Sequence, residues 1–189
     1  MDTKIDFKDP AYYENRELSW IKFDQRVLSE ARDKSIPLLE RLKFVSITSS
    51  NLDEFFMVRI GSLVDMIHAE YTKKDIAGMS AKEQLDALME ETHKFAALQY
   101  STYNRMLLPQ LRANGLNFVE HHEQLTERQA QYVDEYFEEN VYPVLTPMAV
   151  DSSRPFPLIR NKTLNIGALV AKKGEKDTEI EFATVQVCL

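Results

Sequence analysis

Residues 15–28, NRELSWIKFDQRVL, decide the fold of the first half of this chain. From Ser19 onward, apolar residues recur at steps of three and four, which is typical of one buried face of a helix. Ser19 is the expected N-cap, because its hydroxyl can accept a hydrogen bond from the first turn, and the helix is expected to end near Lys34. The residues of the expected buried face are Trp20, Phe23, Val27, Leu28 and Ala31.

A second and a third helix are expected to follow this stretch. Pro37 suits a first helical turn, and the apolar residues after it predict a short helix that ends near Thr48. The polar residues 48–51 interrupt the pattern, and apolar periodicity then resumes for several turns. Asn51 is the expected N-cap of the third helix, with Glu54 reaching back as in a capping box.

A long fourth helix is predicted after a loop at residues 73–78. Ser80 and Glu83 form an S-x-x-E start signal, and the apolar residues beyond them keep helical spacing. Pro109 is expected to kink this helix or to start a new turn, and Asn114 with Gly115 to stop it. The first part of the chain, residues 1–112, is therefore predicted to be an antiparallel helical bundle.

The second part of the chain, residues 113–189, has a different texture. Residues 116–119 are expected to form a short strand, and residues 126–140 an acidic amphipathic helix that starts at Thr126 with Gln129. A proline-rich extended stretch follows. Two β-like runs, 163–171 and 179–187, are then expected to pair through a hairpin connection at 172–176.

The predicted fold class is therefore α+β, with a helical bundle followed by part of a mixed α/β domain. The last β-like run reaches almost to Leu189. A strand there would leave an unpaired edge, and more sequence is expected beyond it.

Composition excludes several classes of protein. A chain of 189 residues with 44% hydrophobic residues is expected to be globular, and its net charge of −7 argues against a broad surface for duplex nucleic acid. The single cysteine, Cys188, cannot form an internal disulfide, which favours a reducing cytosol. The first residues, MDTKIDFKDP, contain no apolar h-region, and no later apolar run approaches the ~18 to 20 residues that a membrane helix needs, so a soluble chain without a targeting segment is expected.

The standard catalytic motifs are missing from this sequence. It contains no glycine-rich phosphate loop, no H-E-x-x-H and no G-x-S-x-G, and no catalytic or metal-ligating residue is assigned. The adjacent histidines His121 and His122 suggest a phosphoryl acceptor. Their acidic neighbours, and an extended backbone in which adjacent side chains point opposite ways, favour a solvated loop instead. His68 and His93 are expected on polar faces of helices.

The more informative candidate site is residues 49–55, SSNLDEF. A polar helix N-terminus offers free backbone amides and a side-chain amide that can donate and accept, which suits a purine edge or an anion. Asn51 as an ordinary cap, with Asp53 and Glu54 as acids that match the helix dipole, explains the same residues. Arg154, in the segment RPFP, has a similar pair of interpretations: a phosphate contact or an ion pair with an acid.

Three segments in series resemble the N-terminal domain of the polyphosphate kinase family. They are residues 15–28, residues 37–44 (PLLERLKF) and residues 50–59 (SNLDEFFMVR), and they match in order and spacing. Residues 143–147 (PVLTP) and 154–157 (RPFP) resemble the second, or head, domain of that family. The resemblance covers nearly the whole chain.

The resemblance implies a reversible transfer of the terminal phosphate of ATP to inorganic polyphosphate, through a phosphohistidine and with Mg²⁺. It implies that the helical domain forms the adenine side of the ATP site, that Asn51 contacts the nucleotide and that the head domain makes a homodimer. The phosphorylated histidine and the arginines that bind Mg²⁺ and phosphate belong to C-terminal domains that nothing here matches. The chain alone is therefore expected to be inactive. The family also implies a cytoplasmic enzyme, with membrane association as an open alternative.

A second hypothesis comes from another class of protein. The helical bundle and the helix at residues 126–140 would bind protein partners and no nucleotide, and Asn51 would only cap its helix.

Overall fold

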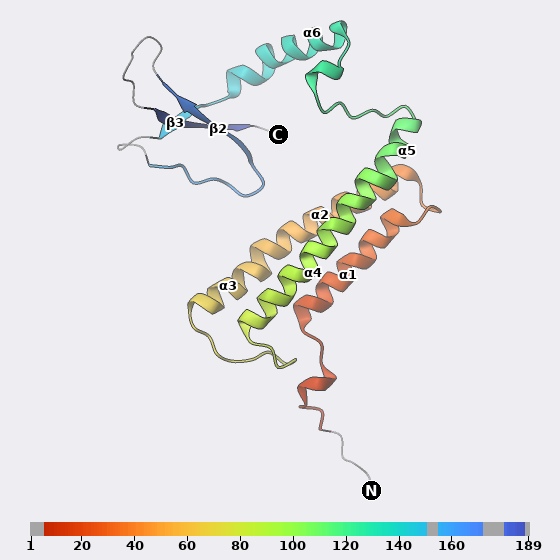
Figure 1. Ribbon diagram of the computed structural model, residues 1–189, viewed down its shortest axis with the longest axis vertical. Helices are drawn as coiled ribbons and strands as arrows, with labels where there is room; N and C mark the ends of the chain where they lie inside the picture. Colours follow the sequence, from red (N-terminus) through yellow and green to blue (C-terminus); the bar gives the residue numbers. More distant parts are fainter. Residues whose placement is uncertain (1–5, 151–154, 172–179, 188–189) are drawn as a thin grey trace. The chain divides into compact units, whose positions relative to one another are not determined.

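The computed structural model describes residues 6–150, 155–171 and 180–187, and Figure 1 shows them. The chain forms two compact units, 1–118 and 119–189. We call them the helical unit and the sheet unit and describe each by itself. The boundary expected from the sequence, between residues 112 and 113, stays a prediction of where the functional domains divide.

The helical unit consists of three long rods that lie side by side, and the second rod runs antiparallel to the first and to the third (Figure 1). One rod is α1 (Arg16–Arg32). The second joins α2 (Leu38–Phe55) to α3 (Gly61–His68) through a π-helical segment, Phe56–Ile60, and the third joins α4 (Ala81–Ser101) to α5 (Leu108–Ala113) through another, Thr102–Leu107. The predicted helical bundle is confirmed.

The first helix begins before its predicted start. Asn15 Oδ1 accepts a hydrogen bond of 2.9 Å from the backbone N–H of Leu18, so Asn15 is the N-cap and the prediction of Ser19 is wrong. Asn15 is buried and also donates from Nδ2 to Asp75 and Gln84. Contacts to residues distant in sequence thus fix the start of α1, and these are invisible in the local pattern.

The polar residues 48–51 do not break the second helix, and the prediction of Asn51 as an N-cap is wrong. They lie inside α2, which continues to Phe55. The Thr48 hydroxyl donates to the Val45 carbonyl at 2.8 Å and accepts from Gln99 Nε2 at 2.9 Å, while Asn51 donates to Asp24. Tertiary partners thus bond Thr48 and Asn51 inside the helix, so these two side chains need no helix end.

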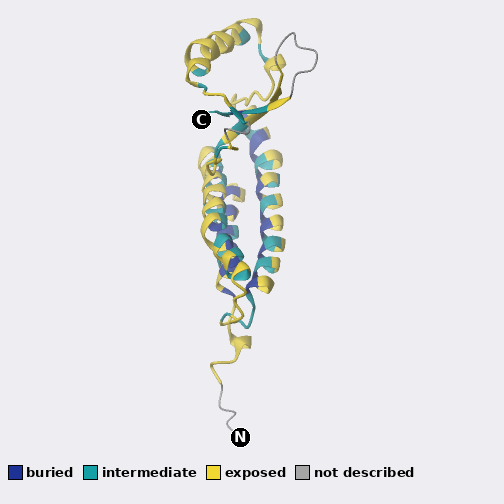
Figure 2. Cartoon of the chain, turned by 90° about the vertical axis from the view of Figure 1, so that its left-hand side faces the viewer, coloured by how far each residue is buried: buried dark blue, intermediate teal, exposed yellow. Residues whose placement is uncertain are grey.

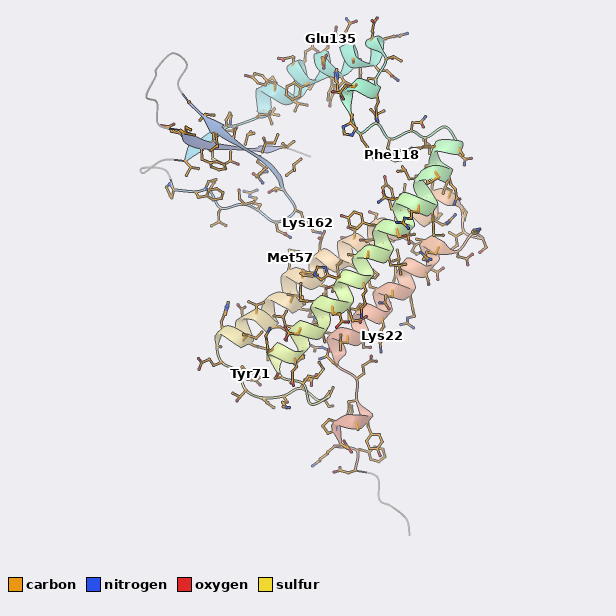
Figure 3. The ribbon with its side chains drawn as sticks, in the orientation of Figure 1. Lys22, Met57, Tyr71, Phe118, Glu135 and Lys162 are labelled. Carbon is orange, nitrogen blue, oxygen red and sulfur yellow. The ribbon has the colours of Figure 1, made fainter. Side chains whose placement is uncertain are left out.

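The signals around the third rod are confirmed. A loop joins α3 to α4, with Tyr71 in it (Figure 3). Ser80 and Glu83 make a reciprocal capping box at the start of α4. Pro109 lies in the first turn of α5, directly after the π-helical segment, and the rod ends at Asn114 and Gly115, whose φ of +82° is the left-handed conformation that favours glycine.

The core of the helical unit lies between the rods, where the buried residues of Figure 2 gather along the facing sides of the helices. Burying one such aliphatic or aromatic side chain contributes about 1.5 to 3 kcal/mol. The two clusters of the core are Ile21, Phe55, Ile60, Leu63, Ala81 and Leu88, and Leu28, Ala31 and Phe95.

The sheet unit contains α6 (Glu127–Tyr136), continued by a π-helical segment, Phe137–Val141, and a three-stranded antiparallel sheet. Thr126 and Gln129 form the predicted capping box. The two predicted strands are present as β2 (Leu164–Val170) and β3 (Glu181–Val187), paired from Leu164 with Val187 to Val170 with Glu181. The α+β fold class is confirmed, and the predicted connection at residues 172–176 lies outside the described residues.

Two predictions for residues 113–189 are wrong. Residues 116–119 form no strand, because no described strand pairs with them. The expected open edge at the last strand is also absent among the described residues. The proline-rich stretch contains a short strand that was not predicted, β1 (Met148–Val150). It pairs with β3, so the strand order in the sheet is β1-β3-β2.

Candidate functional site

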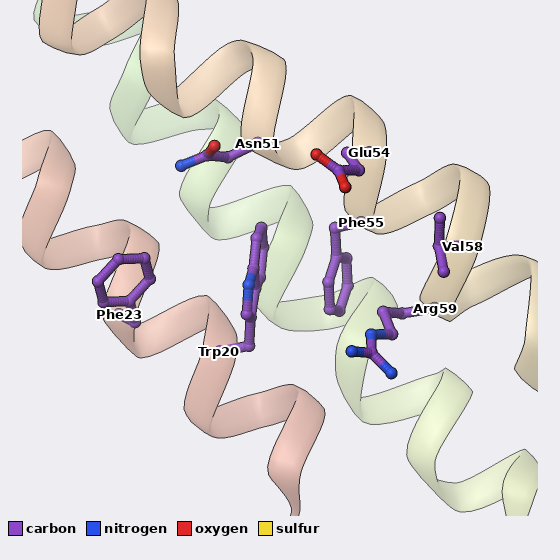
Figure 4. Close-up of a pocket in the computed structure, with 7 residues that line it drawn as sticks. All are labelled: Trp20, Phe23, Asn51, Glu54, Phe55, Val58 and Arg59. Carbon is purple, nitrogen blue, oxygen red and sulfur yellow. The ribbon is translucent and has the colours of Figure 1, made fainter.

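A pocket of about 230 Å³ lies between α1 and the second rod of the helical unit (Figure 4). We call it the aromatic pocket. Its lining comes from α1, from the last turns of α2 and from the π-helical segment: Trp20, Phe23, Asn51, Glu54, Phe55, Val58 and Arg59.

Two stacked rings form one side of the aromatic pocket. The Trp20 and Phe55 rings have centroids 4.3 Å apart and planes 11° apart, and Figure 4 shows them nearly parallel. Phe55 is buried and anchors the stack, while Phe23, also in the lining, is 47% exposed. Aromatic surfaces of this kind suit a flat, apolar ligand such as a heterocyclic base.

The amide of Asn51 is held in one orientation. Its Nδ2 donates to Asp24 Oδ1 at 2.9 Å, and a carboxylate can only accept, which assigns the nitrogen to that side. In the described part of the chain no donor reaches Asn51 Oδ1. Asn51 Oδ1 is therefore left as a hydrogen-bond acceptor on a residue that lines the aromatic pocket.

The partner of Asn51 is unusual for an acid. Asp24 is fully buried in the middle of α1, and its Oδ2 has no hydrogen-bond partner among the described residues. Burial raises the pKa of the Asp24 carboxyl, and the hydrogen bond from Asn51 opposes that rise in part. The pair of Asp24 and Asn51 thus places a buried acid directly behind the pocket.

The other end of the aromatic pocket carries charge. Arg59 Nε lies 3.9 Å from Glu17 Oε2, and Arg16 Nη2 lies 2.5 Å from Glu17 Oε1. The Glu17 carboxylate is 9% exposed, so this acid holds both guanidinium groups from within the fold. A cation therefore stands at one end of the pocket, and the amide of Asn51 is also in its lining.

The sequence-based hypothesis on residues 49–55 is thus partly corrected. These residues lie within α2, so the backbone N–H groups that a helix N-terminus would leave free are absent here. Asp53 and Glu54 lie in the last turn of α2, and their expected match to a helix N-terminus is wrong. Asn51 does line a pocket, and its contact with a nucleotide stays a prediction.

The histidines stay outside this site. His121 and His122 are exposed, and His122 Nε2 lies 3.0 Å from Asp134 Oδ1 within the sheet unit. His68 and His93 are exposed on α3 and α4, as predicted for polar helix faces. Arg154 and Cys188 lie outside the described residues.

The rest of the aromatic pocket was not predicted from the sequence. Trp20 and Phe23 were expected on the buried face of the first helix, whereas the buried positions of α1 are Glu17, Ile21, Asp24, Leu28 and Ala31. The signal that could have revealed the pocket is the apolar arc of α1, which includes Ile21 as well as Trp20 and Phe23 and is wider than one buried face requires.

Within the described residues no helix is long and apolar enough to span a membrane. No group of three or more His, Cys, Asp or Glu residues is arranged there to hold a metal ion.

Comparison with known proteins gives the same family for both units. The profile of the polyphosphate kinase N-terminal domain matches residues 13–119, and that of the polyphosphate kinase middle domain matches residues 128–188. A polyphosphate kinase of Lactiplantibacillus plantarum is 49% identical over 183 residues, and one of Bacillus anthracis is 45% identical over 186 residues; each alignment covers 97% of this chain.

The fold agrees with a solved structure. The crystal structure of polyphosphate kinase from Porphyromonas gingivalis matches 90% of this chain with a TM-score of 0.66 and 29% identity. The chain spans 24% of that protein, and 25% and 26% of the length of the two curated relatives.

Proposed function

The chain belongs to the polyphosphate kinase family, as its sequence indicated, and we propose that its helical unit forms the adenine side of an ATP site. The reaction proposed for the whole protein is the reversible transfer of the terminal phosphate of ATP to inorganic polyphosphate, through a phosphohistidine and with Mg²⁺. Because the chain spans about a quarter of its relatives, this activity is proposed for a longer protein that carries the remaining domains.

The aromatic pocket is the feature of the structure that best supports a role in nucleotide binding. The stacked rings of Trp20 and Phe55 give an adenine ring an apolar wall, and Asn51 offers a carbonyl oxygen at the same pocket. Adenine carries an exocyclic amino group that donates, whereas guanine and hypoxanthine carry a carbonyl oxygen at the equivalent position. An acceptor fixed by Asp24 therefore favours adenine.

The phosphoryl transfer itself is assigned to other parts of the longer protein. Phosphoryl transfer depends on positioning and on cations or metal ions around the moving group. The exposed histidines His121 and His122 lie beside acids, and the described residues offer no cluster of metal ligands. We propose that this chain alone is inactive and that the phosphohistidine and the Mg²⁺ site belong to further domains.

Assembly is proposed to involve the sheet unit. Its helix α6 exposes Tyr132, Val133, Tyr136 and, in the following segment, Phe137. A homodimer through this unit would give these side chains a partner. The longer protein is proposed to act in the cytoplasm, with membrane association as the alternative that fractionation would reveal.

The same exposed surface supports the second candidate function, a protein-binding module without a nucleotide. The two functions differ at Asn51. As a nucleotide contact, Asn51 affects the Michaelis constant for ATP; as a structural residue that bonds to Asp24, it affects the stability of the helical unit alone.

Steady-state kinetics of the longer protein test the nucleotide role. Asn51→Ala is expected to raise the KM for ATP about tenfold, which corresponds to about 1.4 kcal/mol and to the loss of one hydrogen bond in a desolvated site. The matched control is Asn104→Ala, since Asn104 is exposed on the π-helical segment Thr102–Leu107, away from the aromatic pocket. An unchanged KM and kcat in Asn51→Ala would refute the proposal.

A further inference from the structure

A second pocket of the helical unit, of about 540 Å³, lies between α2 and the third rod. We call it the tyrosine pocket. Its volume falls within the range of about 300 to 1,000 Å³ that is usual for small-molecule sites. Its lining comes from α2, α4 and the π-helical segment after α4: Leu42, Lys43, Val45, Ser46, Ser49, Gln99, Tyr100 and Tyr103. None of these residues lines the aromatic pocket.

The tyrosine pocket and the aromatic pocket lie on different faces of α2. The α2 residues that line the tyrosine pocket include positions spaced as i, i+3, i+4 and i+7, which share one helix face: Leu42, Val45, Ser46 and Ser49. Asn51, two residues beyond Ser49, is rotated from it by about 200° around the helix axis and lines the aromatic pocket. A ligand in one pocket therefore leaves the other open.

Most of the surface of the tyrosine pocket is apolar. Leu42, Val45 and Tyr103 are half-buried, and Tyr100 is 67% exposed. Within the described part of the chain, no other aromatic ring contacts Tyr100 or Tyr103. Tyrosine rings without a ring partner, next to aliphatic side chains, suit a flat aromatic ligand.

One polar side chain of the tyrosine pocket is held in a single orientation. Gln99 is 8% exposed, and its Nε2 lies 2.9 Å from Thr48 Oγ1. The Thr48 hydroxyl gives its one proton to the Val45 carbonyl, so Thr48 accepts from Gln99, and the amide nitrogen of Gln99 is on that side.

The oxygen of the same amide is left as an acceptor. No donor among the described residues reaches Gln99 Oε1. The buried polar side-chain atoms without a partner in that part of the chain are Asp24 Oδ2 and Arg41 Nη2, so Gln99 Oε1 is not sealed from solvent. A residue that is otherwise buried therefore presents one accessible hydrogen-bond acceptor, and this residue lines the tyrosine pocket.

The charge at the tyrosine pocket is offset. Lys43 is the one lysine or arginine of the lining, and its Nζ lies 2.7 Å from Glu40 Oε2. A site for a phosphate or a carboxylate instead uses several cations or a bidentate arginine. The tyrosine pocket therefore suits a neutral ligand.

From this geometry we propose that the tyrosine pocket binds a neutral, flat aromatic molecule that carries an N–H or O–H donor, of the class of an indole or a phenol. The ring of this ligand packs against the tyrosine rings and the aliphatic side chains, and its donor bonds to Gln99 Oε1. The site is additional to the proposed nucleotide site and does not depend on it.

Calorimetric titration of this chain with indole and with 1-methylindole tests the site. The two molecules differ at the donor, which is N–H in indole and N–CH₃ in 1-methylindole. Indole is expected to bind about five- to tenfold more tightly, which corresponds to about 1 to 1.4 kcal/mol and to one hydrogen bond. No binding of indole, or equal affinities for the two molecules, would overturn the proposal.

A pocket-filling variant places the ligand in the structure. Ser46→Trp puts a large ring at the exposed rim of the tyrosine pocket and is expected to weaken indole binding about tenfold or more. The matched control is Ser29→Trp, because Ser29 is an exposed serine of α1 that lines neither pocket. The control is expected to bind indole within about twofold of the wild type. Equal affinities of the two variants would contradict the proposed site, and thermal melts check that both are folded.

The role of Gln99 is tested by Gln99→Met, which keeps the length of the side chain and removes the acceptor. The preference for indole over 1-methylindole is expected to fall toward one. The variant also loses the bond to Thr48 and is expected to unfold at a lower temperature. The ratio of two affinities measured on the same folded variant is independent of that loss, and a preference that persists would show that another group binds the donor, against the proposal.

Two further titrations exclude other occupants. Phe23→Ala, which removes an exposed ring of the aromatic pocket, is expected to leave indole binding unchanged. Weaker binding by this variant would place indole in the aromatic pocket and overturn the proposal. The longer protein is expected to bind indole as this chain does. Loss of binding there would show that another domain covers the tyrosine pocket, and would also overturn it.

Discussion

The helical unit and the sheet unit form their secondary structure equally well, but they differ in how much of it they bury. The helical unit has two clusters of buried apolar residues, whereas among the described residues of the sheet unit only Thr184 is buried. Both α4 and α6 begin with a reciprocal capping box. Local signals thus make a helix in either unit. Burial of its apolar face requires packing partners, which the helical unit supplies for α4.

The difference also separates their roles. The helical unit has enough core to hold pockets in a fixed shape, with Phe55 and Asp24 anchored beneath the aromatic pocket. The sheet unit instead presents apolar side chains on its surface, with Leu169 75% exposed and Tyr136 52% exposed. The first arrangement suits a ligand site and the second a protein interface.

The largest expected difference comes from replacing one leucine by alanine in each unit. Leu88→Ala removes a fully buried side chain and is expected to lower the free energy of unfolding of the helical unit by about 2 to 5 kcal/mol. Leu169→Ala removes an exposed side chain and is expected to cost about 0.5 kcal/mol or less. Urea unfolding followed by circular dichroism measures both, and similar losses would remove the contrast between the units.

The capping boxes give an intermediate effect and a matched pair. Ser80→Ala and Thr126→Ala each remove the side-chain oxygen that accepts from the third helical residue, at a cost of about 1 kcal/mol. Ser80→Ala is expected to lower the midpoint of urea unfolding of the whole helical unit, because α4 contributes to the core of that unit. Thr126→Ala is expected to increase amide hydrogen exchange in α6 alone. Increased exchange throughout the sheet unit would show that α6 is more closely integrated than its burial indicates.

The smallest expected effect depends on pH. Since burial raises the pKa of Asp24 above its ordinary value of 3.8, the folded chain holds this proton more tightly than the unfolded chain. The stabilisation that this proton gives is complete below the pKa of Asp24 in the unfolded chain and is lost as the pH rises through its pKa in the folded chain. Asp24→Asn has no proton to lose at this position. The free energy of unfolding of the variant, relative to that of the wild type, is therefore expected to rise with pH above 3.8 and then to level off. Urea midpoints measured across the acid range test this, and a difference that does not vary with pH would contradict it.

The parts of the fold that were predictable rest on local chemistry. The starts of α4 and α6 follow from S-x-x-E and T-x-x-Q, and the end of α5 follows from Gly115, because each signal acts within one turn. The start of α1 and the continuity of α2 could not be predicted. Asn15 is held by Asp75 and Gln84, and Thr48 by Gln99, and these partners lie more than 50 residues away along the chain.

The candidate site divides in the same way. Asn51 was found from its resemblance to a known motif, although the local reason given for it, a helix N-terminus, is wrong. Its actual setting depends on α1, which supplies both Asp24 behind it and Trp20 beside it. A pocket between two helices requires their packing, which no single segment of the sequence contains.

The central claim is that the carbonyl of Asn51 reads the amino group of adenine, and base selectivity tests it most directly. ATP and inosine triphosphate differ at that group, an amine in one and a carbonyl oxygen in the other. For the longer protein, the ratio of kcat/KM for ATP to that for inosine triphosphate is expected to be about tenfold or more, about 1.4 kcal/mol, and to fall toward one in Asn51→Ala. An equal ratio in the wild type and in Asn51→Ala would contradict the account.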